Sequence, residues 1–180
     1  MASPADRQDL FRRIYEARYG AIAAYARRRV DHHDADDVVA ETFLVAWRRL
    51  SDIPQGEGTL PWLYGVARKV ISQRRRGARR GGMLLARLAR VGPVGDVAIS
   101  ESDLFDMQEP VHQALVKLRP QDQELLRLSE WEDLAPAQLA VIYECSVNAV
   151  TIRLHRARRR FGQALQAVEA EPVAHREGSA

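Results

Sequence analysis

The stretch SVNAVTIRLHRARRR, residues 146–160, combines five arginines with apolar residues at helical spacing. Val150, Leu154 and Ala157, with Phe161 just beyond the stretch, stand at positions i, i+4, i+7 and i+11. This spacing places apolar side chains on one stripe of an α-helix. Ser146 stands just before the helix, where its hydroxyl can cap the first free backbone N–H groups. The opposite face is polar and basic, and it carries Asn148, Thr151, Ile152, His155, Arg156 and Arg159.

The preceding stretch, LAPAQLAVIYEC (134–145), predicts a shorter helix that tolerates Pro136 in its first turn. Taken alone, a basic helix face is better explained as a surface that meets only solvent. A short helix, a tight turn and a second, basic helix form the helix-turn-helix pattern, which places the second helix in the DNA major groove. Residues 146–160 are therefore predicted to be a recognition helix. Its last three arginines, Arg158 to Arg160, are predicted to contact the DNA backbone.

The composition is that of a globular protein without disulfides. The 180 residues carry a net charge of only +3, so the placement of charge matters more than its total. The single cysteine, Cys145, cannot form an internal disulfide, which fits a reducing cytosol. No apolar run approaches the roughly 20 residues needed to span a bilayer, and the N-terminus has no signal-peptide pattern. We expect a cytoplasmic protein that does not insert into membranes.

Helical spacing also runs through the rest of the chain, which predicts an all-α fold. Three helices are expected in the first 80 residues: one over 10–30, one over 34–50 capped by Asp34, and one that begins near Pro61. Their apolar stripes include Ile14, Ile22 and Ala26; Val39, Phe43 and Ala46; and Leu63, Val66, Ala67, Val70 and Ile71. Glycines and then acids mark residues 81–106 as a flexible linker. A second helical domain follows over 107–167, and 168–180 form a tail.

Three segments resemble one family. DADDVVAETFLVAWRRL (34–50), LPWLYGVARKVISQRRR (60–76), and LRPQDQELLRL (118–128) with the helix-turn-helix after it resemble sigma factors of the extracytoplasmic function (ECF) group of the sigma-70 family. The resemblance implies a protein that binds core RNA polymerase and directs it to promoter DNA. It implies that the first domain reads the −10 element and the second reads the −35 element. It also implies control by an anti-sigma protein.

On the 34–50 helix, a mixed acidic and apolar set lies off the apolar stripe and suits a basic partner helix. The resemblance makes this set the docking site for core polymerase: Asp37, Val38, Ala40, Glu41 and Leu44. The −10 element would be held by the aromatic and polar residues of the third helix: Trp62, Tyr64, Arg68, Lys69, Gln73, Arg75 and Arg76. Taken alone, Trp62 suits the core better than a DNA contact. The six residues opposite the apolar stripe of the 146–160 helix would read the −35 element.

Some positions depart from the family pattern. The family often has Asn at Lys69 and Asp at Gln73, and it usually has a basic residue at Thr151 and a small polar one at Ile152. Ile152 could meet a thymine methyl group instead of donating a hydrogen bond. Gly is usual where this chain has Glu144.

Other functions find less support in the sequence. His32, His33, Asp34, Asp36 and Asp37 form a run of possible metal ligands, but sequential ligands rarely converge on one ion, so no metal and no cofactor are expected. No catalytic motif is present, and neither an enzyme nor a small-molecule substrate is expected. A free-standing helix-turn-helix regulator is the main alternative. A module that binds only an acidic protein partner is a third possibility.

Overall fold

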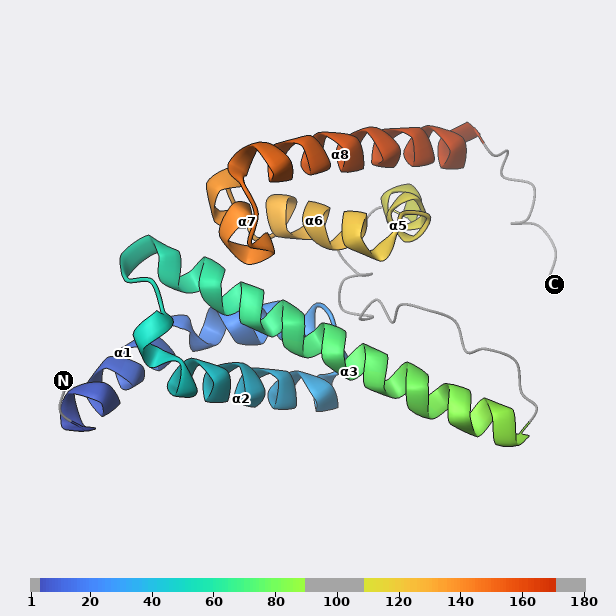
Figure 1. Cartoon of the computed structure of the whole chain (residues 1–180). Coiled ribbons are helices and arrows are strands. Elements are labelled where there is room, and N and C mark those ends of the chain that lie inside the picture. The colour runs from blue at the N-terminus through green and yellow to red at the C-terminus, as the bar shows by residue number, and fades with distance from the viewer. Residues whose placement is uncertain (1–3, 90–108, 171–180) are drawn as a thin grey trace. The chain divides into compact units, whose positions relative to one another are not determined.

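The computed structural model describes residues 4–89 and 109–170, with side chains described for 4–77 and 109–170 (Figure 1). All regular secondary structure within these ranges is helical. The chain divides into two compact units. One contains the helices α1, α2 and α3, and the other contains α5, α6, α8 and most of α7. The predicted fold, two small helical domains of which the second holds a helix-turn-helix, is confirmed.

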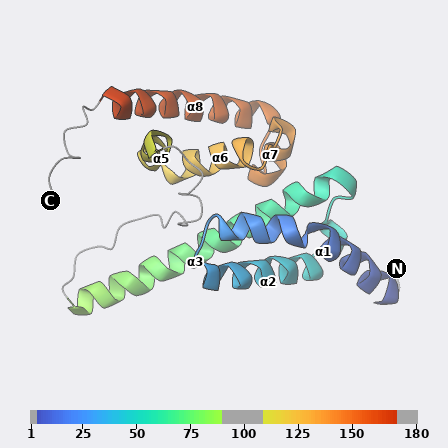
Figure 2. The same cartoon turned by 180° about the vertical axis from the view of Figure 1, so that it is seen from behind.

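The first unit is a three-helix assembly. It consists of α1 (Pro4–Arg27), α2 (His32–Arg48), the short 3-10 turns η1 (Leu50–Asp52) and η2 (Gly56–Gly58), and α3 (Thr59–Ala89). The three α-helices contact one another pairwise, and in Figures 1 and 2 the second half of α3 extends beyond the other two. The predicted stripe of α3 is buried throughout: Leu63, Val66, Ala67, Val70 and Ile71.

The start of α2 differs from the prediction. Asp31 occupies the N-cap position with extended backbone, and no side-chain hydrogen bond caps the helix there. The predicted cap, Asp34, lies inside the first turn. A carboxylate in that turn still interacts favourably with the helix dipole. Several aspartates in one short run make the capping position ambiguous in the sequence.

Three helices also extend past a predicted limit: α1 begins at Pro4 instead of Leu10, and α3 and α8 end later than predicted. Helix α3 continues through Gly81 and Gly82 to Ala89, so residues 81–89 of the predicted linker are helical. Residues 90–106 of that linker lie outside the described residues. The last helix, α8, ends at Ala170, so only residues 168–170 of the predicted tail are described, and they are helical.

The second unit consists of α5 (Glu109–Val116), α6 (Pro120–Glu130), α7 (Pro136–Tyr143) and α8 (Val147–Ala170). Helix α8 packs along α5 and α6. Three residues of its predicted stripe join the leucines of the rest of the unit in one buried core, whereas the fourth, Phe161, is half-buried. The core residues are Leu115, Leu118, Leu125, Leu126, Leu128, Val150, Leu154 and Ala157. The buried Gln123 amide donates to the Leu118 carbonyl at 2.9 Å, which satisfies a backbone oxygen just after α5.

Candidate nucleic-acid and protein interfaces

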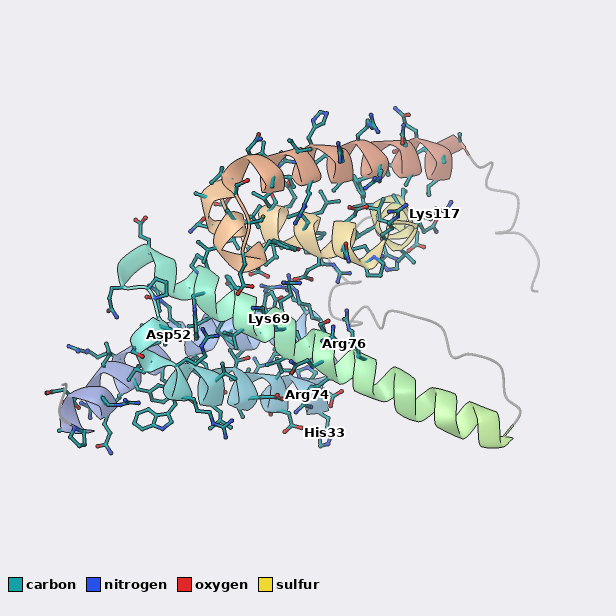
Figure 3. The ribbon with its side chains drawn as sticks, viewed as in Figure 1. His33, Asp52, Lys69, Arg74, Arg76 and Lys117 are labelled. Carbon is teal, nitrogen blue, oxygen red and sulfur yellow. The ribbon has the colours of Figure 1, made fainter. Side chains whose placement is uncertain are left out.

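One arginine of α3 joins the acidic side of α2. The Arg74 guanidinium lies 3.3 Å from a carboxylate oxygen of Asp37, 3.4 Å from Glu41 and 3.6 Å from Asp34. Figure 3 shows this side chain where α3 passes the start of α2. Asp34 and Asp37 are exposed, and Glu41 is half-buried. One guanidinium therefore contacts three carboxylates, so this group of side chains keeps a net negative charge.

Most of the predicted docking set on α2 is accessible, with one exception. Asp37, Ala40 and Leu44 are exposed, and Leu44 keeps 47% of its surface. Val38 is fully buried, so its assignment to an exposed patch is wrong. The reason is that α2 packs against both α1 and α3, which widens its buried face beyond one stripe. We call the accessible residues, Asp37, Ala40, Glu41 and Leu44, the α2 docking face.

An aromatic cluster at the α1–α2 seam was not predicted. Phe11, Tyr15 and Tyr19 follow one another at i, i+4 and i+8 on α1 and meet Phe43 and Trp47 of α2. The closest ring pair, Tyr15 and Phe43, has centroids 4.7 Å apart. Tyr15 and Tyr19 remain 39% and 37% exposed. The i, i+4, i+8 spacing of aromatic residues was a signal in the sequence that could have identified this seam.

The two aromatic residues predicted to meet the −10 element lie in different surroundings. Trp62 is half-buried, with the Arg49 guanidinium 5.7 Å from its ring. Tyr64 is buried, and its ring lies 5.0 Å from that of Tyr25. Its assignment as a DNA-stacking residue is therefore wrong, because a side chain in the core cannot stack on a base. Tyr64 flanks the predicted apolar stripe on the side of α3 that faces α1.

The polar residues of α3 separate into two groups. Lys69, Gln73 and Arg76 are exposed and stand at i, i+4 and i+7, so they share one face of the helix; Figure 3 labels Lys69 and Arg76. Arg68 is half-buried, as is Arg75, which donates a hydrogen bond to the Arg29 carbonyl at 2.8 Å. Arg75 thus ties α3 to the end of α1, while the first group presents cations and an amide to a partner.

The loop before α3 has a tightly defined shape. The Thr59 hydroxyl donates to the Pro54 carbonyl at 2.7 Å, and Thr59 is buried. A Cβ on Gly58 would lie 2.8 Å from the Cβ of Pro54, closer than side chains tolerate. Pro54, Gln55 and Glu57 are exposed around this turn. The loop therefore holds its exposed residues at the start of α3 in a fixed arrangement.

The helix-turn-helix is formed as predicted. Pro136 is the first residue of α7, and the Ser146 hydroxyl accepts a hydrogen bond from the Ala149 N–H at 3.2 Å, as an N-cap does. Glu144 has a φ of 50°, and the Cys145 N–H donates to the Ala140 carbonyl at 3.1 Å. This is a Schellman-type helix end, whose left-handed position is usually glycine.

All six residues assigned to the DNA-reading side of α8 are exposed: Asn148, Thr151, Ile152, His155, Arg156 and Arg159. We call them the α8 exposed face. The opposite side, with Val150, Leu154 and Ala157, is buried in the core of the second unit. The structure therefore fixes the orientation of α8 by packing and leaves the predicted face accessible.

Two of the three arginines that end the 146–160 stretch form ion pairs within the second unit. Arg158 donates to Glu130 at 2.7 Å and to Ser129 at 3.2 Å, and Arg160 donates to Asp122 at 2.9 Å. Both acids belong to α6, so these arginines join α8 to the helix beneath it. The prediction grouped all three as DNA-backbone contacts, whereas two are ion-paired within the unit. Arg159 alone of the three belongs to the α8 exposed face.

The described residues form neither a cluster of metal ligands nor a membrane-spanning helix. No group of three or more His, Cys, Asp or Glu side chains among them is placed to hold a metal ion. None of the described helices has the length and apolar character required to cross a membrane.

The chain is similar in sequence to several proteins named as RNA polymerase sigma factors. The chain is 28% identical over 155 residues to the RNA polymerase sigma-H factor of Pseudomonas aeruginosa, covering 76% of this chain and 75% of that protein. It is 29% identical over 167 residues to the ECF RNA polymerase sigma factor SigL of Mycobacterium tuberculosis, covering 87% of this chain and 89% of the relative.

Solved structures have the same fold. The complex of CnrH with the cytosolic domain of CnrY matches with a TM-score of 0.59 at 25% identity, over 89% of this chain and 90% of the other. The sigma factor RpoE of Bartonella quintana, solved with the anti-sigma factor NepR, matches with a TM-score of 0.64 at 22% identity, over 87% and 96% of the chains.

The family assignment rests on two regions in order. The family described as "Sigma-70 region 2" matches residues 14–81, which fall in the first unit. The family described as "Sigma-70, region 4" matches residues 108–161, which contain α5 to α7 and the first half of α8. The chain therefore belongs to the sigma-70 family of RNA polymerase sigma factors, in its ECF group.

Proposed function

We propose that this sigma factor binds core RNA polymerase through the α2 docking face and directs it to promoters with distinct −10 and −35 elements. The observation that carries the proposal is the presence of both sigma-70 regions in one chain, each within a unit that has its own buried core. A free-standing regulator would need the second region for DNA binding and would use the first domain only for dimerisation, which does not account for the match of that domain to sigma-70 region 2.

The α2 docking face suits a basic partner. Its carboxylates Asp37 and Glu41 border the exposed Leu44 and Ala40. Apolar contacts provide affinity, and complementary charge provides specificity and speed of association. A basic helix of core polymerase has the chemistry to fit this face. Tyr15 and Tyr19, which contact Phe43 of α2 and remain partly exposed, would add apolar surface for a partner.

The two promoter elements would be recognised by different chemistry. The exposed cations of α3, Lys69 and Arg76, would hold the phosphates of melted −10 DNA, and the half-buried Trp62 lies at the start of the same helix. Arg68 and Gln73 would complete this −10 surface, while Arg75 contributes by fixing α3 to α1. The α8 exposed face would enter the major groove of the −35 duplex.

Control and location follow from the same proposal. CnrH was solved with the cytosolic domain of CnrY, and RpoE with an anti-sigma factor. We extend this to the present chain, which an anti-sigma protein would hold inactive by covering surfaces needed for polymerase or DNA. The protein would act in the cytoplasm, where polymerase and promoters are found. It would carry out no catalysis of its own and would need no cofactor.

Reconstitution tests the proposal. The full chain is mixed with core RNA polymerase, separated by size, and supplied with a promoter library that has randomised −35 and −10 windows. The chain should co-elute with core polymerase, and transcription of the enriched library members should require it. Tight and specific binding of the chain alone to duplex DNA, without co-elution, would instead establish the free-standing regulator.

A further inference from the structure

The N-terminal half of α8 exposes apolar groups where a DNA-reading helix usually presents polar ones. Val147 keeps 49% of its surface exposed and Ile152 keeps 43%. Both belong to the first six residues of the helix, the part of a recognition helix that contacts base edges. Neither residue contributes to the buried core, so packing does not explain them.

Thr151 adds a third apolar group to this region. Its hydroxyl donates a hydrogen bond to the Val147 carbonyl at 2.8 Å, one turn back along the same helix. The hydroxyl proton is therefore committed to the backbone and cannot donate to a base. Thr151 is exposed, so its hydroxyl oxygen can still accept a hydrogen bond and its methyl group can contact an apolar group of a partner. We call Val147, Thr151 and Ile152 the apolar patch of α8.

The polar residues around the patch fix its partner as nucleic acid. Asn148 and Arg156 stand four residues before and after Ile152, and His155 stands four residues after Thr151; all three are exposed. An amide and a guanidinium are the side chains that pair with adenine and guanine edges in the major groove. A patch surrounded by such groups would lie against bases rather than against an apolar protein surface.

Only one apolar feature exists among base edges in the major groove, the C5 methyl group of thymine. We propose that Thr151 and Ile152 select thymine in the −35 element through contact with this methyl group. The proposal rests on the proposed function, since it assumes that α8 reads the −35 duplex. Successive residues differ by about 100° around a helix, so Thr151 and Ile152 would contact methyl groups of different base pairs.

The test removes one methyl group at a time from the DNA. The −35 sequence is first selected with the full chain bound to core polymerase, from a duplex library with randomised windows. Each thymine of the selected −35 element is then replaced by deoxyuridine, which lacks the methyl group and keeps every hydrogen-bonding atom. We expect binding to weaken by about fourfold at one or two thymines, the value for burying one apolar carbon group.

Protein variants assign the effect to named residues. Ile152→Ala should bind thymine and deoxyuridine equally at one of these positions, because the partner of the methyl group is gone. At another position, Thr151→Ser should lose the preference and Thr151→Val should keep it, since only valine retains the methyl group. Gln166→Ala serves as a matched control and should keep the thymine preference. Gln166 is also exposed on α8, but it lies about 21 Å along the helix from Ile152.

The possible outcomes separate this inference from the proposed function. If no −35 sequence is enriched, the proposed function itself fails. If a sequence is enriched but deoxyuridine binds as well as thymine at every position, the sigma factor assignment stands and thymine selection is wrong. A thymine preference that Ile152→Ala and Thr151→Ser leave unchanged would also overturn the inference. Folding of each variant is checked by its melting temperature, which should stay near that of the parent because both side chains are exposed.

Discussion

Glu144 adopts a backbone conformation that costs free energy for any residue with a Cβ. Its φ of 50° lies in the left-handed region, which costs a non-glycine residue roughly 1–2 kcal/mol. Glu144→Gly should therefore raise the free energy of unfolding by about 1 kcal/mol, after the entropy lost by fixing a glycine. Chemical denaturation of the full chain measures this. Glu144→Ala is the control, because it removes the same carboxylate and keeps the Cβ; equal stability of the two variants would contradict the prediction.

Gly58 illustrates a different restriction, that of space. A Cβ there would meet the Cβ of Pro54 at 2.8 Å, and the loop that would have to move is held by the bond from Thr59 to Pro54. Gly58→Ala should lower the free energy of unfolding by roughly 1–3 kcal/mol, the usual cost of overpacking. Gly20→Ala is the matched control, because nothing lies within 4 Å of a Cβ at that exposed helical position. It should stabilise by up to about 1 kcal/mol. Two variants of equal stability would refute the argument.

Single-residue predictions from the sequence succeeded where one local signal decided the matter. Ser146 was predicted as a cap because a hydroxyl directly precedes an apolar stripe, and it caps α8. Val38 and Tyr64 were assigned to exposed sites, but both are buried. Each lies beside its helix's main stripe, on the side that a second neighbouring helix covers. Apolar periodicity identifies the most apolar face of one helix, but it does not show how many other helices pack against that helix.

The α2 helix combines a structural and a proposed docking role in the same carboxylates. Asp37→Arg would place a cation beside Arg74, which now pairs with Asp37 at 3.3 Å. The loss of stability should be small, about 1 kcal/mol or less, since Asp37 is exposed. Binding to core polymerase should weaken by at least about tenfold, or roughly 1.4 kcal/mol, because the charge that faces the partner is reversed.

A charge swap separates these two roles. The double variant Asp37→Arg with Arg74→Asp restores an ion pair between α2 and α3 while the exposed face keeps the wrong sign. Melting temperature should recover only in part, because an aspartate at position 74 also lies beside Glu41 and Asp34. Binding to core polymerase, measured by titration of a labelled full chain, should stay weak. Recovery of both quantities would mean that Asp37 matters only through its pair with Arg74.

Helices were easier to predict than their ends. The buried stripe of α3 was identified residue by residue, but the helix was expected to stop near Gly81 and Gly82, and it continues to Ala89. Each glycine costs a helix only about 1 kcal/mol. The residues after them, MLLARLA, are good helix formers, so propagation offsets that cost.

The ion pairs from Arg158 and Arg160 to α6 could not be predicted, because they join residues 28 and 38 positions apart.

The two units each have a core, and the proposed function requires both to engage one promoter at once. Linked binding modules gain affinity from each other because the second contact becomes intramolecular. Arg76 on α3 and Arg159 on α8 are exposed and belong to different units, so each can report the engagement of its own unit. The order of the two regions was clear from the sequence because each carries its own motif.

Salt dependence of promoter binding by the holoenzyme tests simultaneous engagement. Arg76→Ala should reduce the slope of log K against log salt by about 0.7, the value for a single-strand phosphate, and Arg159→Ala by about 0.9, the value for a duplex phosphate. The double variant should lose about the sum of the two, since the contacts are made together. Arg75→Ala is the control: its side chain binds the Arg29 carbonyl, so it should lower the melting temperature and leave the slope nearly unchanged. A slope that responds to Arg159 and not to Arg76 would mean that the second unit binds DNA without the first, as a free-standing regulator would.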